Sequence, residues 1–113
     1  RVRPAVHRVS ASDYGYAARK NIAMDQLRPV IESTAAGRGW QLSDVKQGSF
    51  VGMREWGNGK HNVVVLVSYR PNDFSIDYKD SKLMGYNGSS IHHTYNEMVI
   101  ELEEAIKAAV SKL

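Results

Sequence analysis

The stretch HNVVVLVSYRPNDFSIDYKDS, residues 61–81, decides the fold because it reads as two strands joined by a tight turn. Proline presets the backbone angle φ, so Pro71 suits the first central position of a turn. A two-residue turn that pairs Arg70 with Asp73 makes three apolar pairs across the strands: Tyr69 with Phe74, Val67 with Ile76, and Val65 with Tyr78. These side chains share one face, which predicts a sheet with a single buried face.

The segment GNGK, residues 57–60, predicts a second hairpin in front of the first, because asparagine and glycine tolerate positive φ. A two-residue loop at its centre would place Arg54 on the core face, opposite Val63. A three-residue loop over residues 57–59 shifts the register by one and buries two apolar residues instead, which favours it by about 2 to 4 kcal/mol. The sequence therefore predicts a bulged hairpin that pairs Met53 with Val63 and Val51 with Val65.

Helical spacing of apolar residues appears on both sides of these strands. The first helix is predicted over about 25–36, with Asp25 as its N-cap and glycines at its end. The second is predicted over about 90–112, with Ser89 or Ser90 as its N-cap. Its apolar stripe consists of Ile91, Tyr95, Met98, Val99, Leu102, Ile106, Ala109 and Val110.

Together these elements predict an α+β fold, a two-layer sandwich of an antiparallel four-stranded meander with two helices on one face. The meander begins with a strand entered through Trp40. The segment AVHRVSA, residues 5–11, alternates and predicts a short extra strand at the N-terminus. We interpret residues 1–23 as a basic N-terminal segment or tether, and residues 24–113 as one domain.

Charge is unevenly distributed along the chain. Residues 1–20 carry five basic side chains and one acidic one, whereas residues 21–113 carry ten basic and eleven acidic ones. The folded body is therefore close to neutral, which argues against a nucleic-acid-binding face. The chain has no cysteine, which excludes disulfides, and no apolar run long enough to span a bilayer.

No catalytic, cofactor or metal motif is complete in this sequence, so none of these is predicted. His93, Glu97 and Glu101 follow at helical spacing on one face, but a zinc site needs ligands that converge from more than one element. Ser81, Ser89 and Ser90 lie near His92 without a nucleophile elbow. Neither a P-loop nor a dinucleotide-binding glycine motif occurs.

The segments GRGW, residues 37–40, and FSIDYKDSKLMGYNGSSIHHTYNEMVIELEEAI, residues 74–106, resemble a family of small, uncharacterised bacterial envelope proteins classed as lipoproteins. The matching positions are Tyr78, Ser81, Tyr86, Ile91, His92, Tyr95 and Asn96. Where that family often has tryptophan, this chain has Met98. The resemblance implies a protein of the periplasm or outer membrane, with a lipidated cysteine before Arg1 that anchors it to a membrane surface.

Our leading hypothesis is a non-enzymatic envelope domain, periplasmic or lipid-anchored, of unknown binding role. The alternative is a small-molecule or metal-binding module centred on Tyr78, Ser81, His92, Tyr95 and Asn96. Together with Tyr86, these residues form the candidate cluster, which is either structural or ligand-binding. A weak nucleic-acid-binding domain is a third hypothesis. We expect this cluster to join strand, loop and helix, with His92 facing inward to bond Ser81 or a backbone group, and His93 facing solvent.

Overall fold

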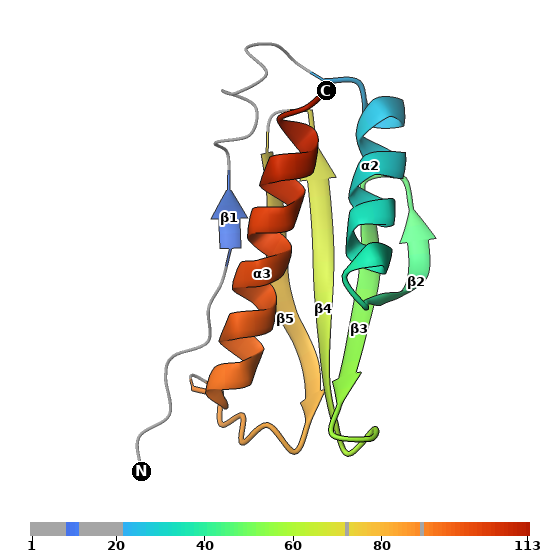
Figure 1. Cartoon of the computed structure of the whole chain (residues 1–113). Coiled ribbons are helices and arrows are strands. Elements are labelled where there is room, and N and C mark those ends of the chain that lie inside the picture. The colour runs from blue at the N-terminus through green and yellow to red at the C-terminus, as the bar shows by residue number, and fades with distance from the viewer. Residues whose placement is uncertain (1–8, 12–21, 72, 89) are drawn as a thin grey trace.

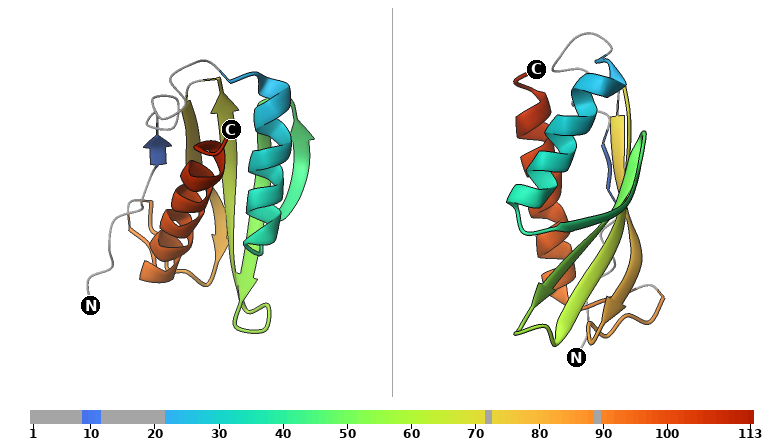
Figure 2. Two further views of the ribbon diagram at one scale, coloured as in Figure 1. Left: turned by 45° about the horizontal axis from the view of Figure 1, so that its top comes forward. Right: turned by 90° about the vertical axis from the view of Figure 1, so that its right-hand side faces the viewer.

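The computed structural model describes residues 9–11, 22–71, 73–88 and 90–113, and it shows two layers (Figures 1 and 2). One layer is an antiparallel sheet and the other is a pair of helices that cover a single face of it. The strands are β1 (Val9–Ala11), β2 (Gln41–Lys46), β3 (Ser49–Trp56), β4 (His61–Arg70) and β5 (Asp73–Lys82), and the helices are α2 (Met24–Gly37) and α3 (His93–Val110). The predicted α+β sandwich is confirmed.

The strand order in the sheet is β1-β5-β4-β3-β2, and every neighbouring pair is antiparallel. Strands β2 to β5 form the predicted meander. The three residues of β1 pair with β5 at the edge, with Val9 opposite Ile76. The extra N-terminal strand is therefore present, although the rest of residues 1–21 lies outside the described part of the chain.

The register predicted for β4 and β5 is confirmed. Arg70 pairs with Asp73, and the apolar pairs follow as expected: Tyr69 with Phe74, Val67 with Ile76, and Val65 with Tyr78. A bulge between Val64 and Val65 then shifts the pairing, so that Val64 lies opposite Asp80. The alternation of apolar and polar residues fixes this register, because a slip by one would expose the whole apolar set.

The register predicted for β3 and β4 is wrong. Arg54 pairs with Val63 and Trp56 with His61, which is the arrangement of a two-residue loop. Asn58 and Gly59 both have positive φ, at 59° and 83°, and the Lys60 N–H bonds the Gly57 carbonyl at 3.2 Å. These angles fit a type I′ turn, whose twist matches that of the flanking strands.

The inner face of β3 accommodates this register through Gly52 and Arg54. A Cβ atom on Gly52 would lie 3.3 Å from Cε3 of Trp40, so the glycine makes room for the buried indole. The side chain of Arg54 is only 28% exposed and its Nη1 lies 3.0 Å from a carboxylate oxygen of Glu101 on α3. The aliphatic part of an arginine side chain can be buried while its guanidinium group stays paired with a carboxylate. Arg54 therefore does not place an unpaired charge in the core, as the prediction assumed.

The two apolar residues assigned to the core, Val51 and Met53, lie instead on the face away from the helices. There they pair with Leu66 and Val64 of β4, and all four are half-buried. None of the described helices covers this face (Figure 2).

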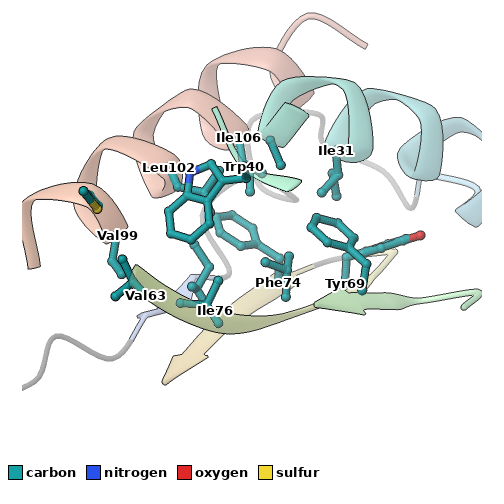
Figure 3. Packing of buried hydrophobic residues seen from close by; sticks show 14 of the residues in the cluster. Ile31, Trp40, Val63, Tyr69, Phe74, Ile76, Val99, Leu102 and Ile106 are labelled. Carbon is teal, nitrogen blue, oxygen red and sulfur yellow. The ribbon is translucent and has the colours of Figure 1, made fainter. Parts of the chain in front are cut away.

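The core fills the space between the inner face of the sheet and both helices (Figure 3). Strands β4 and β5 contribute the Val63, Tyr69, Phe74 and Ile76 side chains, and Trp40 packs between the layers. Most residues of the predicted helical stripes are buried, at Leu27, Ile31 and Ala35 in α2 and at Tyr95, Met98, Val99, Leu102, Ile106 and Val110 in α3. Of the other two α3 stripe residues, Ala109 is half-buried, and Ile91 is buried but precedes the helix.

The helices differ from their predictions mainly at their N-termini. The N-cap of α2 is Ala23, which makes no side-chain cap bond, and not Asp25. Asp25 lies inside the first turn, where its carboxylate suits the positive end of the helix dipole. The N-cap of α3 is His92, so the prediction of Ser89 or Ser90 as its N-cap is wrong.

Candidate functional site

Three tyrosines of the candidate cluster meet at the end of β5. The hydroxyl of Tyr78 lies 2.8 Å from that of Ser81, three residues further along the chain. The ring of Tyr86 stacks on Tyr78 at 4.1 Å between centroids, and the ring of Tyr95 meets Tyr78 edge-on at 5.6 Å. Strand, loop and helix are thus joined by ring contacts around one residue, as expected for offset and edge-to-face aromatic pairs.

His92 belongs to a different group of rings. Its Nδ1 accepts a hydrogen bond from the Thr94 N–H at 3.1 Å and so caps α3. Its ring stacks on His93 at 4.4 Å and lies 5.8 Å from Trp56. Of the two expected partners, Ser81 or a backbone group, this bond uses a backbone group, but one that lies in the helix and not at the end of β5. His92 is half-buried and His93 is exposed, as predicted.

Sequence reasoning missed the two residues that connect this group to the sheet. Trp56 and His61 are the last pair of the β3–β4 hairpin, and their rings stack at 4.1 Å and 15°. His61 Nδ1 lies 2.9 Å from the Leu83 carbonyl, so it donates to that oxygen. The turn GNGK contained the signal, because a two-residue loop pairs Trp56 with His61.

Hydrogen bonds join the described residues of the loop between β5 and α3. The Ser90 N–H donates to the side-chain oxygen of Asn87 at 2.9 Å, and the Asn87 N–H donates to the Ser90 carbonyl. The His92 N–H donates to the Met84 carbonyl at 2.7 Å, and Met84 is buried. Asn96, the sixth residue of the cluster, is half-buried on the first turns of α3.

The described residues contain no group of three histidine, aspartate or glutamate side chains arranged to hold a metal ion. The side chains of His93, Glu97 and Glu101, considered above as metal ligands because of their helical spacing, do not converge. Glu101 points to Arg54, and His93 stacks on His92.

The alkaline stability of the protein should depend on Tyr78. Burial raises the pKa of its hydroxyl above the ordinary 10.0, and the neighbouring Asp80 adds to this, although the bond to Ser81 acts in the opposite direction. A pKa raised by folding means that the protonated form is favoured, so this contribution is complete below about pH 10 and is lost as the pH rises through the folded pKa. Urea unfolding as a function of pH should show stability falling above about pH 10.

The matched variant is Tyr78→Phe, which keeps the ring contacts and removes the titrating hydroxyl. Its stability should fall less steeply with alkaline pH than that of the wild type. Some pH dependence should remain, because burial also raises the pKa of Tyr69. Identical slopes for the variant and the wild type would contradict the assignment.

The cap that His92 provides can be tested by two substitutions. His92→Ala removes the acceptor for the Thr94 N–H and should lower the free energy of unfolding by about 1 kcal/mol. His92→Asn keeps a side-chain acceptor that is favoured at N-caps and should recover most of that loss. Chemical denaturation of the three proteins gives the comparison, and equal losses for both variants would show that the ring contacts matter more than the cap.

Comparison with family models, with curated proteins and with solved structures finds no match for this chain. None of the described helices is long and apolar enough to cross a membrane.

Proposed function

We propose that this chain is a non-enzymatic domain of the bacterial envelope, periplasmic or lipid-anchored, whose binding role is unknown. The observation that carries the proposal is that the polar side chains of the candidate cluster bond nearby residues of their own strand or helix. Tyr78 and Ser81 bond each other, and His92 caps α3. The first bond lies within β5 and the second at the start of α3, while the rings of Tyr86 and Tyr95 join the loop and α3 to Tyr78. These contacts support an architectural role for the cluster.

Two features of the sequence support the envelope assignment. The residues that resemble the envelope family are the ones that hold this junction together, from Tyr78 to Tyr95. The basic excess is concentrated in residues 1–20, and such a segment is attracted to an anionic membrane surface.

Fractionation of the source cell, combined with the intact mass of the native protein, tests this proposal. We expect the protein in the periplasmic or membrane fraction, with a mass that shows processing or lipidation at its N-terminus. A cytosolic protein that starts with methionine and carries no lipid would refute it.

A further inference from the structure

Leu83 is the most exposed large hydrophobic residue in the described part of the chain, at 65%. It follows β5 directly and has a φ of 57°, in the left-handed region that disfavours residues with a Cβ atom. Glycine or asparagine would adopt this conformation with less strain. A strained backbone that presents an apolar side chain to solvent is a feature found at binding sites.

The backbone around Leu83 is fixed on both sides. His61 Nδ1 donates to the Leu83 carbonyl at 2.9 Å, and His61 itself is held by stacking on Trp56. The next residue, Met84, is buried, and its carbonyl accepts the His92 N–H. The backbone that carries the exposed Leu83 side chain is therefore held in place on both sides.

An amphipathic aromatic residue and two lysines accompany Leu83. Tyr86 is 38% exposed and stacks on Tyr78. Lys82 precedes Leu83, and Lys60 precedes His61 in the β3–β4 turn; both lysines are exposed. The β3–β4 turn and the loop after β5 lie at the same end of the elongated molecule (Figures 1 and 2). We call residues 57–60 and 82–88 the tip.

The charge of the tip has one sign. Its two segments contain Lys60 and Lys82 and no aspartate or glutamate. The nearest carboxylates in the sequence are Glu55 and Asp80, each two residues before a tip segment, and Asp80 accepts a hydrogen bond from the Ser81 N–H at 2.8 Å. A partner with anionic groups is therefore favoured at this end.

We propose that the tip binds the surface of an anionic lipid bilayer. Leu83 enters the boundary of the acyl chains, where burial of an exposed leucine is favourable. Tyr86 lies at the level of the headgroups, as amphipathic rings do in membrane interfaces. Lys60 and Lys82 bind lipid phosphates, and each lysine near an anionic surface strengthens binding about fivefold.

This inference is independent of the proposed envelope role, and its test separates the two. Vesicle binding without an envelope location would overturn the proposed function alone. An envelope location without vesicle binding would overturn this inference alone.

Co-sedimentation with vesicles tests the lipid surface. The full chain should bind vesicles that contain phosphatidylglycerol, bind pure phosphatidylcholine vesicles less, and lose binding as salt is added. Leu83→Asn should weaken binding about tenfold or more, because the apolar side chain is lost. It should not impair folding, because asparagine tolerates the left-handed region. A double Lys60→Gln, Lys82→Gln variant should bind phosphatidylglycerol vesicles about 25-fold more weakly than the wild type, although the basic residues 1–20 still favour an anionic surface.

Ile100→Gln is the matched control. Ile100 is 40% exposed on α3, away from the tip, and glutamine is compatible with a helix. Its binding should equal that of the wild type. Equal weakening by Ile100→Gln and Leu83→Asn, or no preference for anionic vesicles, would overturn the proposal. The absence of vesicle binding would also overturn it.

Discussion

Replacement of Gly52 by valine is expected to destabilise the protein by about 3 kcal/mol, because the added methyl groups overpack the core. A Cβ atom at this position would already lie 3.3 Å from the Trp40 ring and 3.6 Å from a methyl group of Val65. Valine has the higher intrinsic preference for strands, by up to about 1 kcal/mol. Strand propensity and core packing therefore predict changes of opposite sign in the free energy of unfolding. Denaturant unfolding of Gly52→Val decides between them.

Two further variants make this result specific. Gly37→Ala changes a glycine at the end of α2 whose added Cβ would meet nothing within 4 Å. It should be neutral or stabilise by up to about 1 kcal/mol. Gly52→Ala should be less costly in a Trp40→Leu background than in the wild type, and the double-mutant cycle measures this coupling. Additive effects would show that the indole does not constrain position 52.

The sequence was a sufficient guide where apolar and polar residues alternate without a break. In β4 and β5 a shift by one residue would expose Val65, Val67 and Ile76 together, so only one register is tolerable. The same reasoning located the apolar stripes of both helices. It needs only the period of each element and the requirement for a single core.

Counting apolar residues failed in β3, because the count did not consider Gly52 and treated Arg54 only as a charge to be kept out of the core. The glycine is the place where Trp40 packs, and the arginine reaches Glu101. Both facts depend on elements far away in the sequence. The turn chemistry of Asn58–Gly59, which is local, indicated the right register and deserved more weight than about 2 to 4 kcal/mol of assumed burial.

The candidate site was predicted as a junction, but its internal contacts were not. The motif grouped the tyrosines of β5, the loop and α3, which the structure brings together around Tyr78. It did not indicate that His92 would cap α3 in place of a serine, or that Trp56 and His61 would support it. Those two residues come from a hairpin outside the motif, so only the three-dimensional arrangement reveals them.

Tyr95 is the core member of this junction, and its removal should have the largest effect of any substitution within the cluster. The side chain is fully buried at the start of α3 and meets Tyr78 edge-on. Tyr95→Ala should lower the free energy of unfolding by about 4 kcal/mol, as large-to-small changes of buried aromatic residues do. Thermal and urea unfolding give the measurement.

Two tyrosine variants separate burial from chemistry. Tyr95→Phe keeps the ring, so it should cost about 1 kcal/mol or less. Tyr86 is the other ring partner of Tyr78 and is 38% exposed. Tyr86→Ala should lower the free energy of unfolding by about 1 kcal/mol. If Tyr95→Ala left stability close to that of the wild type, the cluster would not be the junction described above. Its buried ring would then have to be retained for a function other than packing.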